Sequence, residues 1–199
     1  MPQNELVSCA GVLLTGGASR RMGRDKADIP WPGPESSTLA ARTAALLASV
    51  CPVAVEVGPG HTALPRAIEG QPGAGPLAAA VAGFEHLAGG GWAGPVLLVA
   101  TDLPRLTVGL LRWLAGHPGD GSVVPLSGGR VQPLCARYSP ADMRVAARLV
   151  ADGQRAMNRL LDAIDATLVP EELWSGPAGG ADCIVDADTP RDLRRLSES

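Results

Sequence analysis

The sequence is poor in aromatic residues, with one Phe, one Tyr and four Trp among 199 residues. A packed interior must therefore be built mainly from Ala, Val and Leu. With 46% apolar and 19% charged residues, the composition is typical of a packed globular protein and not of a disordered chain. At this length we expect one domain, residues 1–199, that buries about 70% of the surface of the unfolded chain.

The sequence also lacks an excess of charge of one sign, since its formal net charge is −3 at pH 7. A nearly balanced charge gives no support to bulk binding of nucleic acid or of an anionic membrane. No apolar run is long enough to cross a bilayer, and the N-terminal residues have neither the basic start nor the apolar length of a signal peptide. We therefore expect a cytoplasmic protein with no nucleic-acid partner and no membrane association.

Cysteine is scarce as well, and no two cysteines form a C-x-x-C pair. All of them lie in or beside apolar runs, which predicts buried free thiols instead of a disulfide framework or a zinc site. Free thiols are typical of a reducing cytoplasm. The cysteines are Cys9, Cys51, Cys135 and Cys183.

Apolar runs of strand length alternate with segments of helix length along the chain. The expected strands are Leu6–Leu14, Val53–Val57, Val96–Ala100, Ser122–Leu126, Gln132–Tyr138, Ala166–Val169 and Cys183–Val185. The expected helices are Thr38–Val50, Pro76 to about Leu87, Val108–Ala115, one that starts at Ser139-Pro140-Ala141-Asp142, Gln154–Ile164, and one that starts at Thr189-Pro190-Arg191-Asp192. Glu171–Ala181 is expected to be a loop. The alternation predicts an α/β three-layer sandwich, a mostly parallel twisted sheet with helices on both faces.

A glycine-rich, cationic stretch, Leu13–Ile29, follows the first apolar run. Glycines such as Gly16 and Gly17 let the backbone turn tightly and bring its N–H groups close to a ligand. Cations beside such a turn favour a polyphosphate ligand, and a solvated basic turn is the alternative interpretation. The stretch is neither a Walker P-loop, because the glycine spacing differs and no Ser or Thr follows Lys26, nor a G-x-G-x-x-G dinucleotide motif, which Glu56 alone does not restore.

Aspartates follow two later apolar runs. Asp102 comes at the end of Val96–Ala100, and Asp186 and Asp188 follow Cys183–Val185. Ligands of parallel sheets bind at the carboxyl ends of the strands, so we expect these aspartates on the same edge as the glycine-rich stretch. Mg²⁺ prefers one or two carboxylates together with phosphate oxygens and water, which favours a metal-bridged phosphate site. The alternatives are a cap on the turn before Pro104 and a solvated loop.

These motifs resemble those of the molybdenum cofactor guanylyltransferases, which belong to the MobA-like nucleotidyltransferases, and the resemblance covers nearly the whole chain. The opening motif L-A-G-G-x-S-x-R-M-G-x-D-K-A is similar to Leu14–Ala27, and an acid followed by P-G-x-G-P-L-A is similar to Glu69 with Pro72–Ala78. Further along, C-D-x-P resembles Thr101–Pro104, Q-P-L-x-A-x-Y resembles Gln132–Tyr138, and D-x-D/N-T-P-x-D-L resembles Asp186–Leu193. The opening motif is specific, and the others occur in the family's order.

The resemblance implies a Rossmann-like fold of the nucleotide-diphospho-sugar transferase type. It implies a Mg²⁺-dependent enzyme that transfers GMP from GTP to the terminal phosphate of molybdopterin and releases pyrophosphate. The implied catalytic residues are Arg20, Lys26 and Asp102. The implied nucleotide-binding residues are Leu14, Thr15, Gly16, Gly17, Arg20, Arg21, Gly23, Lys26, Glu69, Gly75 and Asp102. Asp102 would hold the metal, and Asp188 offers it a second carboxylate. On the acceptor side we expect Gln132, Asp186 and Arg155. Arg155 lies outside the family motifs: as a cation on the late helix it is suited to an acidic pterin phosphate, and a solvated helix face is the alternative.

Two positions distinguish the guanylyl branch of the family from the cytidylyl branch, and several others differ from the family's usual motifs. Gly16 and Asp25 match the guanylyl branch, since the cytidylyl branch usually has Ala and Pro there. Thr15 replaces the usual Ala, and the segment Trp31–Ser37 is longer and richer in proline than usual, which affects the acceptor side. The open alternatives are CTP or another phosphorylated acceptor, and a non-catalytic nucleotide-binding protein for cofactor delivery. A molybdoenzyme or a cofactor-delivery protein is a further expected partner.

Overall fold

The computed structural model describes residues 8–16, 26–30, 37–71, 73–187 and 190–197. Within these residues one sheet holds eight strands in the order β3-β2-β1-β4-β7-β5-β6, with β8 beside β5. The strands are β1 (Ala10–Leu14), β2 (Ala54–Val57), β3 (Arg66–Ala67), β4 (Val96–Ala100), β5 (Val123–Ser127), β6 (Arg130–Val131), β7 (Cys135–Tyr138) and β8 (Thr167–Val169). β3, β2, β1 and β4 run parallel, as do β5 and β8, whereas β7 is antiparallel to both β4 and β5.

The α-helices are α1 (Leu39–Ala48), α2 (Pro76–Gly89), α3 (Val108–Ala115), α4 (Pro140–Ala151), α5 (Met157–Leu161), α6 (Glu171–Ala178) and α7 (Pro190–Ser197). Short 3₁₀ helices are η1 (Lys26–Asp28) and η2 (Ala181–Ile184). Side-chain hydroxyls of Thr38, Thr107 and Ser139 accept from the third residue after each, and so cap α1, α3 and α4. No helix of the described residues is long and apolar enough to cross a membrane.

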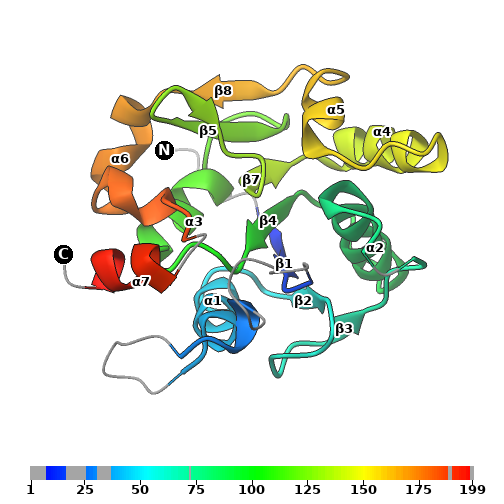
Figure 1. The fold of residues 1–199 in the computed structure, drawn as a ribbon. Helices are drawn as coiled ribbons and strands as arrows, with labels where there is room; N and C mark the ends of the chain where they lie inside the picture. Colours follow the sequence, from blue (N-terminus) through cyan, green and yellow to red (C-terminus); the bar gives the residue numbers. More distant parts are fainter. Residues whose placement is uncertain (1–7, 17–25, 31–36, 72, 188–189, 198–199) are drawn as a thin grey trace.

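Helices cover both faces of the sheet, as the sequence predicts (Figure 1). α2, α4 and α5 pack on one face, where Val12 and Leu14 point, and α1, α3 and α6 pack on the other, where Leu13 points. Because successive side chains of a strand point to opposite faces, β1 is buried on both, which explains its continuous apolar run. α2 lies close to the sheet, since a Cβ at Gly83 would come within 2.5 Å of Val12.

Four predicted elements differ from the structure. The stretch expected to be a loop, Glu171–Ala181, forms α6, and the expected strand Cys183–Val185 lies in and just after η2. α6 carries Pro177, which hid its helical character, and tertiary contacts stabilise it because Trp174 is fully buried and its indole N–H donates to Leu126 O at 3.0 Å. The helix expected at Gln154–Ile164 shortens to α5, and the strand at Gln132–Tyr138 shortens to β7.

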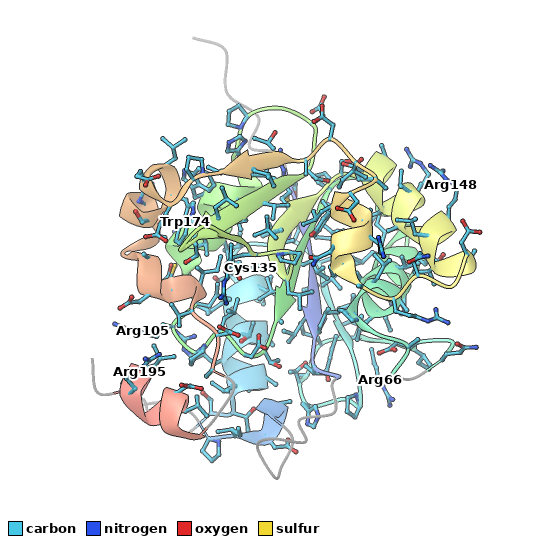
Figure 2. All side chains as sticks on the ribbon, turned by 45° about the horizontal axis from the view of Figure 1, so that its top comes forward. Arg66, Arg105, Cys135, Arg148, Trp174 and Arg195 are labelled. Carbon is cyan, nitrogen blue, oxygen red and sulfur yellow. The ribbon has the colours of Figure 1, made fainter. Side chains whose placement is uncertain are left out.

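The four cysteines are buried and free, as predicted. Cys135 belongs to the same core cluster as Trp174, on the face of the sheet that α1, α3 and α6 cover (Figure 2). Burial raises the pKa of the Cys9 thiol to about 11 and that of the Cys51 thiol to about 12. All four thiols are therefore protonated at neutral pH, which makes them unreactive core residues.

A buried arginine joins the sheet to a loop. Arg137 in β7 is 1% exposed, and its guanidinium donates to the carbonyls of His117, Gly119 and Gly121 at 2.6, 2.8 and 3.0 Å. Burial lowers the pKa of Arg137 from its usual value. The carbonyl oxygens replace the water that a buried guanidinium loses, and they hold the loop between α3 and β5 against the sheet.

Candidate functional site

The carboxyl ends of β1, β2 and β4 meet at one edge of the sheet. Leu14 pairs with Val57 on one side and with Ala100 on the other, so the residues that follow these strands are neighbours. β7 is antiparallel and begins at this edge, where Ala100 N donates to Leu134 O at 2.9 Å. Gln132 comes two residues before Leu134, so the topology brings this predicted acceptor residue to the same edge.

Asp102 and the chain around Asp186 lie side by side at this edge. Ala187 N donates to the backbone oxygen of Asp102 at 2.8 Å. Asp102 is half-buried and Asp186 is exposed. The predicted convergence is confirmed for these residues, although Asp186 follows η2 and not a strand. Asp188 lies outside the described residues.

The C-terminal chain reaches this edge by apolar packing. Ala187 is 1% exposed and packs in a small cluster with Ile29 after η1, Leu39 of α1, and Leu193 and Leu196 of α7. The cluster joins the end of the glycine-rich stretch to the C-terminal helix. The fold therefore brings together the first motif and the last motif of the sequence.

The first residues of the glycine-rich stretch continue the pairing of β1 with β2. Thr15 N and Gly16 N both donate to Val57 O, at 3.0 and 3.4 Å. The predicted residues Gly17, Arg20, Arg21 and Gly23 lie outside the described residues, and of Lys26 only the backbone, at the start of η1, is described.

Glu69 lies against Gly16. A Cβ built on Gly16 would come within 3.5 Å of Glu69 Oε1, an ordinary van der Waals distance. The other carboxylate oxygen of Glu69 is buried and has no hydrogen-bond partner among the described residues. An acceptor atom in this state is suited to a ligand that brings N–H donors.

Arg155 contacts the loop that carries Glu69. Its backbone oxygen accepts from Leu77 N at 3.2 Å, and its guanidinium donates to Gln71 Oε1 at 3.4 Å. Gly75 allows this close approach, since its φ is +105° and a Cβ there would lie 2.9 Å from Arg155 O. The described contacts of Arg155 are thus with the loop before α2 and the first turn of that helix, which include Gly75, one of the residues predicted to bind the nucleotide. They do not join it to Gln132 or Asp186, with which the sequence analysis grouped it.

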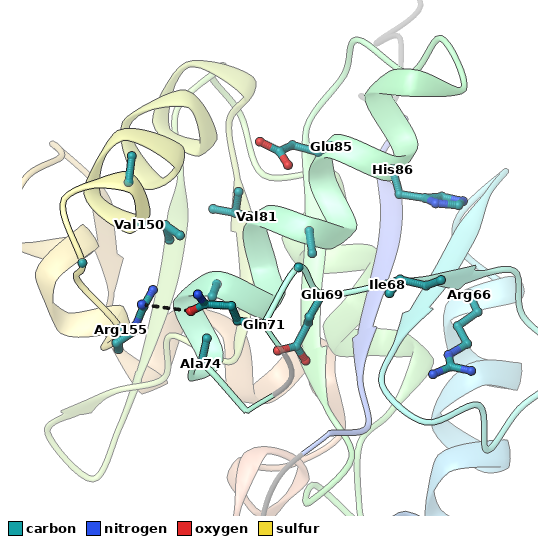
Figure 3. Close-up of a pocket in the computed structure, with 15 residues that line it drawn as sticks. Arg66, Ile68, Glu69, Gln71, Ala74, Val81, Glu85, His86, Val150 and Arg155 are labelled. Atoms are coloured by element: carbon teal, nitrogen blue, oxygen red, sulfur yellow. Dashed lines mark hydrogen bonds between the residues drawn. The ribbon is translucent and has the colours of Figure 1, made fainter.

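A pocket of about 730 Å³ opens beside Glu69, between α2, the loop after β3 and the end of α4 (Figure 3). Small side chains line it, Ala78 and Ala82 from α2 and Ala74 from the loop before that helix. Glu69 and Arg155 lie at the end of the pocket where α2 begins, and Figure 3 shows Arg155 facing Gln71 across it. This end of the pocket therefore has both an acidic and a basic side chain.

Glu56 has a buried carboxylate with many hydrogen-bond partners, which was not predicted from the sequence. Glu56 is 0% exposed, and five hydrogen bonds from described residues reach its carboxylate, from Thr15 Oγ1, Gly60 N, His61 N, Thr62 N and Thr62 Oγ1. Burial alone would raise the pKa of Glu56, but these hydrogen bonds outweigh burial, and the pKa lies below its ordinary value. The only signal in the sequence is an acidic residue within an apolar strand.

The described residues contain no group of three or more His, Cys, Asp or Glu side chains that could enclose a metal ion. A closed metal centre is therefore not formed by this part of the chain. Asp102, a half-buried carboxylate at the ligand-binding edge, fits the kind of site in which one or two carboxylates hold Mg²⁺ and the phosphates and water complete its shell.

Comparison with known proteins identifies similar sequences and folds. A family model described as the MobA-like NTP transferase domain matches residues 11–188. A relative from Mycobacterium tuberculosis, named probable molybdenum cofactor guanylyltransferase, is 38% identical over 169 residues, which cover 81% of this chain and 83% of the relative. One of the same name from Chloroflexus aggregans is 30% identical over 203 residues, covering 98% and 95%. The solved structure of molybdopterin-guanine dinucleotide biosynthesis protein A from Archaeoglobus fulgidus has a TM-score of 0.79 at 19% identity, covering 95% of this chain and 97% of that one.

Proposed function

The chain belongs to the MobA-like NTP transferase family, and we propose that it transfers GMP from GTP to the terminal phosphate of molybdopterin. In this reaction a phosphate oxygen of the acceptor attacks the α-phosphorus of GTP, a new P–O–P linkage forms, and pyrophosphate leaves. We propose that residues 1–199 act as one domain. The observation that carries the proposal is the meeting of Gly16, Asp102 and Ala187 at one edge of a Rossmann-like sheet.

The chemistry needs positive charge, because a phosphate approaches a triphosphate. Two unit charges 4 Å apart repel by about 4 kcal/mol at an effective dielectric constant of 20. We assign Lys26 and Arg20 to offset this repulsion and to stabilise the charge that develops on pyrophosphate. This assignment follows the family motif, since the two side chains lie outside the described residues.

We propose that Asp102 and Asp188 hold Mg²⁺ together with the triphosphate. Bound there, the metal would neutralise phosphate charge during the displacement. Glu69 and Gly75 flank the nucleobase, and Gln132 and Asp186 lie on the acceptor side. We propose that the reaction takes place in the cytoplasm and that the product passes to a molybdoenzyme or a cofactor-delivery protein.

The function is tested with purified protein, Mg²⁺, molybdopterin and each of the nucleotides GTP and CTP. Pyrophosphate release is expected with GTP and molybdopterin together, and not when either is left out. Release with CTP in preference to GTP would contradict the guanylyl assignment. GTP binding with no pyrophosphate release in the presence of molybdopterin would point to another acceptor or to a carrier protein.

Gly16→Ala tests nucleotide selection. The new methyl group fits without strain, since the nearest atom is Glu69 Oε1 at 3.5 Å, and it faces the carboxylate assigned to the base. We expect the ratio of kcat/KM for GTP to that for CTP to fall about tenfold, the scale of one methyl group in a shaped pocket. Steady-state pyrophosphate release with each nucleotide measures the ratio.

Gly89→Ala, at the end of α2, is the matched control, because a Cβ there meets nothing within 4 Å. It should leave the ratio unchanged. An equal ratio in Gly16→Ala and the native protein would remove Gly16 from the determinants of base selection.

A further inference from the structure

Both ends of the glycine-rich stretch contact one short loop, Gly58–Thr62, which follows β2. At the glycine end, Thr15 Oγ1 donates to Glu56 Oε1 at 2.6 Å, and Glu56 in turn accepts from the loop. At the lysine end, His61 Nδ1 lies 2.7 Å from Asp28 Oδ1, two residues after Lys26. A single loop therefore links the two ends of residues 16–26.

The carboxylate of Glu56 determines the conformation of this loop. Its Oε1 accepts from Gly60 N at 3.0 Å and from His61 N at 2.7 Å, and its Oε2 accepts from Thr62 N at 2.9 Å and Thr62 Oγ1 at 2.7 Å. Successive N–H groups that converge on one buried anion leave the loop few alternative conformations. The His61 side chain is thereby directed toward Asp28.

Gly58 brings the loop into close contact with the glycine end. Its φ is +155°, and a Cβ there would overlap Thr15 Oγ1 and come within 2.8 Å of Gly16 N. The absence of a side chain at Gly58 therefore lets the backbone of Thr15 and Gly16 pack against the loop. Because the backbone at Gly58 packs directly against Thr15 and Gly16, we expect a displacement of one of these segments to displace the other.

We propose that Thr15 and Glu56 are positioning residues for the glycine-rich stretch, whose residues 16–26 are predicted to bind the nucleotide. The hydrogen bond between them fixes where the chain leaves β1, and the Gly58–Thr62 loop relates that point to η1 and Lys26. Glu56 acts from the interior, since it is 0% exposed. This inference rests on the proposed function, because it assigns a role in binding GTP to contacts made by the residues that precede and follow the predicted binding motif.

Substitutions of Thr15 can remove its hydroxyl group without changing the volume of the side chain. Thr15→Val keeps the volume and removes the hydroxyl donor, whereas Thr15→Ser keeps the hydroxyl. We expect the Kd and the KM for GTP to rise about tenfold in Thr15→Val, equivalent to about 1.4 kcal/mol, while kcat at saturating GTP changes less than KM. Thr15→Ser should remain within about twofold of the native protein in both constants.

The matched control is Thr43→Val. Thr43 is also buried and donates from Oγ1 to Leu39 O at 2.9 Å, but within α1. The Thr43→Val substitution should lower the midpoint of thermal unfolding about as much as Thr15→Val does, and it should leave the Kd for GTP unchanged. Circular dichroism verifies folding, and Thr15→Ala replaces Thr15→Val if the latter does not fold.

The outcomes separate the two proposals. A native protein that does not bind Mg-GTP overturns the proposed function. A native protein that binds GTP, together with a Thr15→Val or Thr15→Ala variant of equal Kd and KM, overturns the positioning role. Asp28→Ala tests the lysine end, where the proposal requires a weaker GTP affinity, and an unchanged affinity overturns the link through His61.

Discussion

Asp102→Ala should lower the rate of pyrophosphate release at saturating GTP by about 10²–10³-fold, the scale for loss of a group that stabilises charge in the transition state. Asp102 comes two residues after β4, at the edge of the sheet where Gly16 follows β1 and where Ala187 contacts its backbone, and its carboxylate is the proposed magnesium ligand. The substitution spares the backbone oxygen that accepts from Ala187 N. The C-terminal chain therefore keeps this attachment, and the loss isolates the side chain.

The rate is measured with excess molybdopterin over a series of Mg²⁺ concentrations. Asp165→Ala removes an exposed aspartate that lies between α5 and β8, and it should retain the native rate. If Asp102→Ala turns over within a few fold of the native rate, the metal is held elsewhere. A rate that recovers at high Mg²⁺ would instead support a weakened metal site.

Glu56→Gln should destabilise the fold by about 3 kcal/mol or more at pH 7, because each buried donor left unpaired costs about 1–3 kcal/mol. The amide keeps the shape of Glu56 but has one acceptor oxygen in place of two, and its NH₂ group would face N–H or O–H donors. The donors affected lie in the Gly58–Thr62 loop or on Thr15. Urea unfolding followed by circular dichroism measures the change.

The loss of stability caused by Glu56→Gln should depend on pH. The pKa of Glu56 is lower in the folded protein than its ordinary value of 4.5, so its ionised form is favoured by folding. That stabilisation is complete above the ordinary value and is lost as the pH falls through the folded value. The difference in unfolding free energy between native and Glu56→Gln proteins should therefore shrink as the pH is lowered below about 4.5.

Glu172→Gln provides the comparison, since Glu172 is exposed on α6. Its effect should stay below about 0.5 kcal/mol at every pH, as is usual for surface substitutions. A difference for Glu56→Gln that stays constant down to acid pH would mean that Glu56 is not held as the ionised form.

Several elements could be predicted from the sequence almost to the residue. β4 and α3 begin and end where the predicted Val96–Ala100 and Val108–Ala115 segments do, and Ser139 caps α4 as expected. These elements are encoded locally, because apolar periodicity and a capping hydroxyl act over a few residues. The meeting of Asp102 with Asp186–Ala187 was predicted from the rule that ligands bind at the carboxyl ends of strands, but the strand expected before Asp186 is the 3₁₀ helix η2, so the rule accounts only for Asp102.

Other features depend on partners far apart in the sequence. α6 contains Pro177 and has no clear helical pattern, and its formation depends on a buried Trp174 that bonds to β5. Arg155 was expected on the acceptor side as a cation of the helix predicted at Gln154–Ile164, but its contacts are with Gln71 and with Leu77 at the start of α2. Local patterns carry no information about such contacts.

By itself, the sequence determined the alternation of strands and helices, the mostly parallel sheet and the edge of that sheet on which the glycine-rich stretch and Asp102 lie. Only the tertiary structure decided how the buried charges are satisfied. Glu56 and Arg137 stand in apolar strands, and their partners come from the 58–62 loop and the loop after α3. A charge can be buried only where several dipoles converge on it, and that convergence exists only once distant segments have packed together.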